Sequence, residues 1–203
     1  WNMAFELAQG IDIPDIGGLN DGFSKSTDRD GCYTALLSAE KLKGFINGFT
    51  ELIPEPIFFF IELPCTSEEE KRLGGGGHYR LYYLDNCTKP VIKAIMKTYG
   101  DLLVGDGICR FGFGGNESGD EIYVQSYKVM SIYCSNSRVE NGLNKLFKEY
   151  GAEFREALTT PWDIISEENS GVCVRAEEDG ISLFDLPELL EEAGMYFLSL
   201  IHI

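Results

Sequence analysis

Apolar residues recur three and four positions apart over several segments of the chain, which is the spacing of one buried helix face. Ser38 is a predicted N-cap for the first segment, and Ser137 with Glu140 fits a capping box before the third. Most of these segments have proline in the first turn, or proline or glycine just after the last turn, as expected at helix ends. The predicted helices cover residues 38–53, 88–104, 137–150 and, more briefly, 185–193.

Shorter runs rich in aromatic and β-branched residues predict strands between these helices. The run at 121–133 is long for a strand, so we expect a bulge or bend within it. Glu178-Asp179-Gly180 has the composition of a tight hairpin turn. The other predicted strands cover residues 57–63, 78–84, 108–113, 172–176 and 181–184. Residues 1–36 are predicted to be largely irregular, and residues 66–77 to form a polar loop.

This order of elements predicts an α+β fold, because strands in pairs favour an antiparallel or mixed sheet with helices mainly on one face. Two successive ββα units are expected at 57–104 and 108–150, followed by a C-terminal hairpin and helix. No linker-like stretch separates the units, so we expect a single domain over residues 1–197.

Two further expectations concern the ends of the chain. Leu198 to Ile203 is the translation of a nucleotide string that resembles the transposon end used in preparing sequencing libraries. We therefore expect residues 198–203 to be an adaptor-derived, non-native tail on a gene assembled from environmental DNA. The chain begins with Trp1 rather than Met, so we expect the native N-terminus to lie upstream.

The charge balance limits the classes of partner. The formal net charge is -16, from 33 acidic and 17 basic residues. Nucleic acid and anionic membrane surfaces attract basic proteins, so we expect this chain to bind neither. No apolar run reaches the length of a membrane span. An acidic body would instead attract a basic protein, although net charge also serves solubility alone.

Six cysteines are spread singly along the chain, without any C-x-x-C pair. Disulfide frameworks occur mainly in small secreted domains with clustered cysteines. We therefore expect six free thiols and a cytoplasmic protein. The cysteines are Cys32, Cys65, Cys87, Cys109, Cys134 and Cys173.

The glycine-rich stretch 112–121 is the first candidate site. Its oxygen-bearing side chains would suit a hard cation, and its glycines would let backbone amides approach an anion. No lysine follows in the register of a phosphate-binding loop, and a plain hairpin connection is the structural alternative. The candidate binding residues are Asn116, Glu117, Asp120 and Glu121.

Two further motifs are weaker. Residues 26–31 resemble the middle of an EF-hand loop, but Leu37 stands where the bidentate glutamate belongs. His78 follows four glycines and is a candidate general base, with Cys65 or Cys109 as a thiol partner. A histidine without a catalytic role is the alternative. Single histidines and scattered cysteines lack zinc-ligand spacing, so no metal and no cofactor are expected.

Acidic clusters form the last candidate, as a docking face for a basic partner. A solvated surface is the alternative, and paired carboxylates for glycoside hydrolysis would need a cleft that sequence does not show. The clusters used for this prediction are Glu68, Glu69 and Glu70, and Glu177, Glu178 and Asp179.

In size, acidity and order of elements, residues 37–197 resemble the immunity proteins of bacterial toxin systems, which neutralise a cognate toxin by capping it. The resemblance is one of general character, and no functional residue is transferred from it. It implies a non-catalytic bacterial protein-binding domain whose partner is a basic protein such as a toxin. The alternative hypothesis is a small enzyme or ligand-binding domain that uses loop 112–121 and His78.

Overall fold

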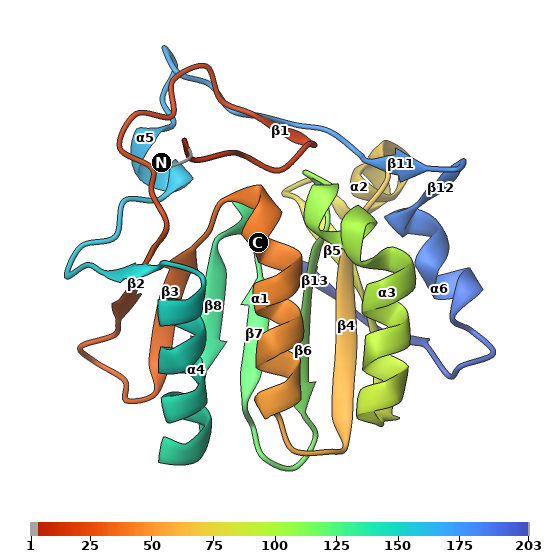
Figure 1. The fold of residues 1–203 in the computed structure, drawn as a ribbon. Coiled ribbons are helices and arrows are strands. Elements are labelled where there is room, and N and C mark those ends of the chain that lie inside the picture. The colour runs from red at the N-terminus through yellow and green to blue at the C-terminus, as the bar shows by residue number, and fades with distance from the viewer. Residues whose placement is uncertain (1–3, 203) are drawn as a thin grey trace.

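The computed structural model describes residues 4–202 and shows an α+β fold built on an open nine-stranded sheet (Figure 1). The strand order is β13-β5-β4-β6-β7-β8-β3-β2-β9. Neighbouring strands are antiparallel, except that β2 and β9 run parallel. The fold class expected from the sequence is therefore confirmed.

The strands of the large sheet are β2 (Gly22–Lys25), β3 (Cys32–Leu36), β4 (Ile57–Pro64), β5 (His78–Cys87), β6 (Arg110–Gly115), β7 (Glu121–Val124), β8 (Met130–Tyr133), β9 (Glu153–Phe154) and β13 (Tyr196–His202). Two short antiparallel ladders pair β1 (Ile11–Asp12) with β10 (Val172–Cys173), and β11 (Glu177–Glu178) with β12 (Ile181–Ser182). The helices are α1 (Ala39–Leu52), α2 (Ser67–Leu73), α3 (Lys89–Gly105), α4 (Ser137–Glu149), α5 (Pro161–Ile164) and α6 (Leu186–Leu189), with 3-10 turns at Ser126–Lys128 and Leu183–Asp185.

Helices α1, α3 and α4 cover one face of the sheet (Figure 1). Phe45 and Phe49 of α1 and Phe147 of α4 are fully buried against the sheet. Phe59 of β4 and Phe113 of β6 stack beneath them, with ring centroids 5.1 Å apart. Each buried phenylalanine contributes roughly 1.5–3 kcal/mol relative to an exposed one. This layer is the core, and the opposite face of the sheet carries no long helix within residues 4–202.

The two expected ββα units are not confirmed: α2 lies between β4 and β5 of the first, and the second contains an additional strand. The stretch 121–133, predicted as one bent strand, folds as the β7–β8 hairpin, so three strands precede α4. The turn places Tyr127 and Lys128 at φ 56° and 60°, a left-handed conformation that neither residue favours. Because the turn contains no glycine, asparagine or aspartate, its composition does not mark it as a turn.

Two helix starts also differ from the predictions. Residues 66–77 were expected as a loop, but Thr66 and Glu69 form a capping box that opens α2. The T-x-x-E spacing of Thr66 and Glu69 is itself a local signal for this helix start. The N-cap of α4 is Asn136 rather than Ser137, and its side chain accepts hydrogen bonds from the next turn. The side chain of Glu140 pairs with Lys25 instead of closing a capping box.

Both ends of the chain contribute more to the fold than expected. Residues 22–36, predicted to be irregular, supply β2 and β3, because pairing with β8 orders a segment that has no strong pattern. Tyr196–His202 forms the edge strand β13 on β5, which leaves the origin of residues 198–203 an open prediction. Trp1 and Ile203 lie outside the described residues.

The C-terminal region departs from its predicted boundaries. The hairpin around Asp179-Gly180 exists, but its strands are only two residues long, and β10 pairs with β1 instead. The last helix ends at Leu189 rather than near residue 193. Among residues 4–202, no helix is both long enough and apolar enough to cross a bilayer.

The end of α3 joins the two terminal segments to the sheet. Gly10 donates to the carbonyl of Gly105 at 2.7 Å, and Gly107 donates to Val174 at 2.9 Å. A Cβ at Gly107 would lie 1.9 Å from the carbonyl oxygen of Gly10, so only glycine permits this approach. Asp106, fully buried, accepts from three backbone amides, including Ala176 at 2.9 Å.

Lys128 is buried beneath this junction. Its Nζ donates to the carbonyl of Leu103 at 3.0 Å, in the last turn of α3, where carbonyls have no partner within the helix. Burial is the main cause that lowers the pKa of Lys128 to about 8, and the Asp106 carboxylate partly opposes it. This arrangement indicates that Lys128 helps to hold the helix end in place.

We predict a pH-dependent contribution of Lys128 to stability. Between pH of about 8 and 10.5, the unfolded chain keeps a proton that the native lysine has lost. Stability from this residue should therefore rise with pH, by at most about 1.4 kcal/mol per pH unit. Urea denaturation across this window should show that the free energy of unfolding of the wild type rises with pH relative to that of Lys128→Met.

The matched control is Lys145→Met, which removes an exposed lysine on α4. Its difference from the wild type should stay flat over the same window. A flat difference for Lys128→Met as well would show that the buried lysine does not titrate there.

Candidate functional site

The helix-free face of the sheet carries aromatic side chains from neighbouring strands. Strand alternation and register put Phe58 and Phe60 of β4 on this face, with Tyr83 of β5 and Tyr123 of β7 beside them. Phe58 and Phe60 lie over two glycines of β6: a Cβ at Gly112 or Gly114 would lie 2.5 or 2.3 Å from a ring atom. Gly112 and Gly114 therefore make room for aromatic rings within a strand and do not belong to a flexible ligand loop.

A buried ion pair lies within the aromatic layer. Nε of Arg110 is 2.6 Å from Oε2 of Glu62, and only 11% and 8% of the two side chains are exposed. The angle at Nε is poor for a hydrogen bond, so the contact is chiefly ionic. The hydroxyl of Tyr123 donates to the same carboxylate oxygen at 2.7 Å, and Arg110 lies 4.0 Å from the ring centroid of Tyr79. Burial, followed by this hydrogen bond, raises the pKa of Tyr123.

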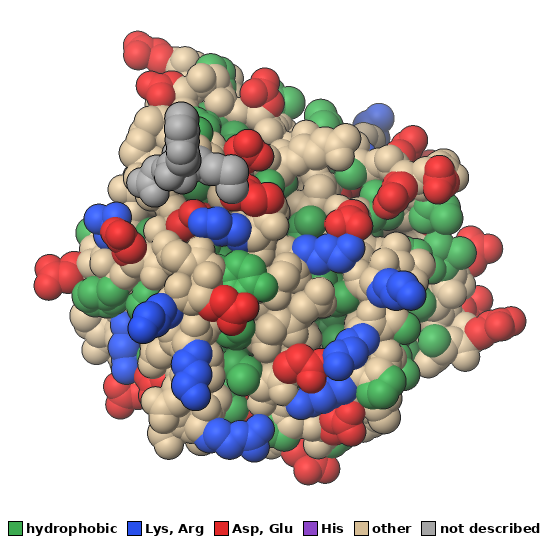
Figure 2. All heavy atoms as spheres, viewed as in Figure 1, with side chains coloured by type: hydrophobic (Ala, Val, Ile, Leu, Met, Phe, Trp, Pro, Cys, Tyr) green, Lys and Arg blue, Asp and Glu red, His purple; other side chains and the backbone are tan. Residues whose placement is uncertain are grey.

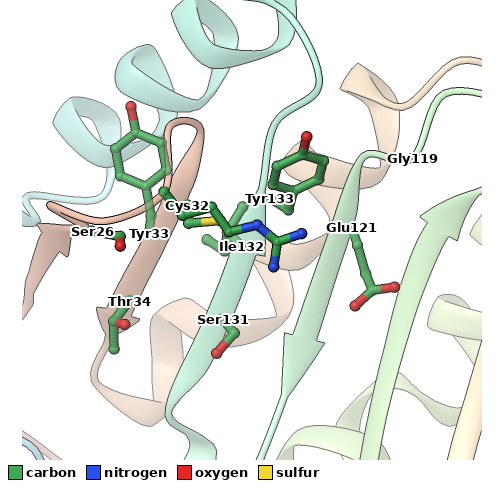
Figure 3. Close-up of a pocket in the computed structure, with 10 residues that line it drawn as sticks. Ser26, Cys32, Tyr33, Thr34, Gly119, Glu121, Ser131, Ile132 and Tyr133 are labelled. Carbon is green, nitrogen blue, oxygen red and sulfur yellow. The ribbon is translucent and has the colours of Figure 1, made fainter.

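A hollow of about 510 Å³ opens on the same face, over β3, β7 and β8 (Figure 3). The register aligns Cys32, Tyr133 and Glu121 across three adjacent strands, and Thr34 with Ser131 next to them. Their side chains gather on one side of the sheet in the close-up. Arg29 and Ser26 of the β2–β3 turn complete the lining. The volume falls in the range of small-molecule sites.

The residues predicted for loop 112–121 do not converge on one point. Asn116 joins the backbone amide of Asn86 to the side chain of Asp85, and Glu117 is exposed. Asp120 is fully buried and accepts from the amide of Ser135 at 2.7 Å, whereas Glu121 points to the helix-free face. Asp120 immediately precedes β7 and is bound to the amide of Ser135, whereas Glu121 lines the hollow, so the two carboxylates form no common cation site among residues 4–202.

The structure places His78 next to the carboxylate of Glu70 and not next to an activated thiol. Nδ1 of His78 lies 3.2 Å from Oε2 of Glu70, which also accepts backbone hydrogen bonds from Gly77 and His78. Cys65 neighbours His78 through a backbone hydrogen bond, but burial raises the pKa of its thiol. Cys109 lies in the core, where burial raises its thiol pKa. A thiol held protonated is a poor nucleophile.

Burial also raises the thiol pKa of Cys87, Cys134 and Cys173. All six are free, as expected, and Cys87, Cys109 and Cys134 are buried. Burial raises the pKa of Cys87 to about 11 and that of Cys134 to about 12. Among residues 4–202, no group of three or more His, Cys, Asp or Glu side chains is arranged to hold a metal ion, and the EF-hand-like residues 26–31 lie in the β2–β3 turn.

The two predicted acidic clusters differ in their surroundings. Glu68 pairs with Arg72, Glu69 caps α2 and lies 3.6 Å from Arg80, and Glu70 contacts His78. By contrast, Glu177, Glu178 and Asp179 are exposed on the β11–β12 hairpin, and none forms an ion pair or side-chain hydrogen bond within residues 4–202. Only the second cluster offers unpaired carboxylates.

We predict that Arg110→Met lowers the free energy of unfolding by about 3 kcal/mol, because it leaves the Glu62 carboxylate buried without its cation. The double variant Glu62→Gln/Arg110→Met should lose less, since it buries no unpaired charge. Chemical denaturation of the wild type and the two variants at one pH measures both effects.

Arg138→Met, which removes an exposed arginine of α4, is the control and should change stability by less than about 0.5 kcal/mol. Equal losses in the single and double variants would argue against an energetically coupled pair.

Comparison of the chain with protein-family models, curated proteins and solved structures gives no match. A proposal for its function must therefore come from the geometry and charges of the chain itself. Two features stand out within the described residues: the hollow on the helix-free face, and the unpaired acids of the C-terminal region.

Proposed function

We propose that this chain is a non-catalytic protein-binding domain that captures a basic protein. The proposed contact surface is the segment 166–195, called the acidic strap below. It runs along the upper margin of the molecule in Figure 1, from beyond α5 to α6. The observation that carries the proposal is the concentration of unpaired carboxylates on the strap.

The strap holds nine acidic residues and a single basic one, Arg175, which stacks on Phe184 at 4.0 Å. All nine acids are exposed. Asp185 caps the turn that begins at Ser182, and the other eight form no ion pair or side-chain hydrogen bond among residues 4–202. Such a group of like charges would favour approach of a cationic surface.

Exposed apolar side chains accompany these acids. Val172, Val174, Ile181 and Leu189 all lie in the strap and are between 36% and 52% exposed. Apolar contacts at the centre with charged groups around them are typical of protein interfaces. The combination favours a protein partner over a purely solvated surface.

The rest of the surface would orient such a partner. Helices α1, α3 and α4 carry eight Lys or Arg against five Asp or Glu, and Figure 2 shows the basic side chains distributed over this face. The remainder of the chain carries nine basic and 28 acidic residues. A basic protein would be repelled by the helical face and attracted to the strap.

The size, acidity and order of elements of the chain favour a more specific proposal. In it, the chain is a bacterial immunity protein that neutralises a basic toxin in the cytoplasm. Free, mostly protonated thiols fit a reducing compartment. Capping a toxin requires a complementary surface and no chemistry of its own. A partner of this kind is expected to be encoded next to this chain.

The test is binding to the purified product of the adjacent gene, measured by surface plasmon resonance at two salt concentrations. Reversal of Glu177, Glu178 and Asp179 to lysine should lower the association rate constant roughly tenfold or more at low salt, because it removes steering charge. The loss should shrink as salt rises.

A matched control changes the same charge elsewhere, by converting the exposed Asp28, Glu149 and Glu156 to lysine. It should retain most of the association rate. Equal effects of the two triple variants, or no binding of the adjacent product by the wild type, would count against the acidic strap as the docking surface.

A further inference from the structure

The hollow on the helix-free face is lined by two opposite charges that form no ion pair with each other within the described residues. Arg29 and Glu121 both line it, yet neither forms an ion pair or a side-chain hydrogen bond among residues 4–202. Two complementary charges that share a cavity without meeting can each bind one end of a ligand.

Arg29 enters the hollow from the β2–β3 turn. Its guanidinium carbon lies 5.5 Å from the ring centroid of Tyr133, within the range of a cation–π contact. That contact holds the charge over the sheet and leaves the donors of the guanidinium free. A planar guanidinium with free donors is well suited to a carboxylate.

Glu121 lines the hollow from β7, opposite Tyr133 in the strand register. It is partly buried, and burial is the main cause that raises the pKa of its carboxyl, with the Glu62 carboxylate second. A partly buried carboxylate without a partner is unfavourable, and a ligand cation would relieve this cost.

Neutral groups between these charges supply further contacts. Thr34 and Ser131 are paired in the register of β3 and β8, and both line the hollow. Oγ of Ser131 accepts from the side-chain amide of Gln125 at 2.6 Å, so its own hydroxyl proton is available to a ligand. The ring of Tyr133 gives an apolar wall for a hydrocarbon portion.

We propose that this hollow binds a small zwitterionic molecule of the amino-acid class, with its carboxylate on Arg29 and its ammonium group on Glu121. The site is separate from the acidic strap and does not depend on the protein-binding role. It includes Gly119 and Glu121 of the glycine-rich loop predicted from the sequence, but not His78. His78 begins β5 at the opposite end of the sheet, and β4 and β6 separate that strand from β7.

The probes are a series of unbranched ω-amino acids, from glycine to 8-aminooctanoic acid, titrated against the full chain by isothermal calorimetry. One chain length should bind best, because the distance between the two charges is fixed by the fold. The carboxylic acid and the amine of the same length, each lacking one charge, should bind at least tenfold more weakly, a difference of about 1.4 kcal/mol.

Arg29→Met and Glu121→Gln should each weaken binding of the preferred amino acid at least tenfold. Glu121→Gln should not change the weaker binding of the carboxylic acid, which lacks the amino group. A variant that failed to fold would lose this binding as well. Arg138→Met and Glu149→Gln, both exposed on α4, are the matched controls and should bind as the wild type does.

Two results would overturn the proposal. One is the absence of saturable binding by every member of the series up to about 10 mM. The other is equal affinity of the wild type and Glu121→Gln for the preferred amino acid. Neither result bears on capture of a basic protein by the acidic strap.

Discussion

Packing of α1 and α4 on the phenylalanine layer of the central strands is the interaction on which the rest of the structure depends. Phe45, Phe49 and Phe147 from the helices meet Phe59 and Phe113 from β4 and β6, and all five are fully buried. This packing covers one face of the sheet and leaves the other without a long helix within the described residues. Strand alternation then assigns every second residue of the central strands to the helix-free face.

The helix-free face therefore collects polar and aromatic side chains. Polar and aromatic residues that share a sheet face are brought together from distant parts of the chain, as with Glu62, Arg110 and Tyr123. The same rule places Thr34 next to Ser131 and Tyr133 next to Glu121, which gives the hollow its mixed lining. The covered face holds the chain together, and the uncovered face carries the groups that can meet a ligand.

The acidic strap depends on a second constraint, at the end of α3. Close glycine contacts and the buried Asp106 hold the strap's backbone to the helix end, while Lys128 caps that end from below. Leu183, Leu186, Leu190 and Met195 of the strap are also buried in the main core, so apolar packing and main-chain hydrogen bonds together hold the segment. Its acidic side chains stay exposed, and the residues that attach the strap are therefore different from the acids proposed for recognition.

The sequence by itself determined the three long helices, most central strands and the fold class, because helical and strand periodicities are local properties of the chain. It also determined the six single cysteines and the excess of acid. The β7–β8 turn could not be predicted, since Tyr127 and Lys128 adopt their left-handed conformation only where tertiary packing imposes it. Tertiary structure alone decided that Asp120 turns inward and Glu121 outward, and that Arg29 and Glu121 share a hollow. These outcomes depend on strand register and on neighbours far away in the chain, which composition and spacing do not contain.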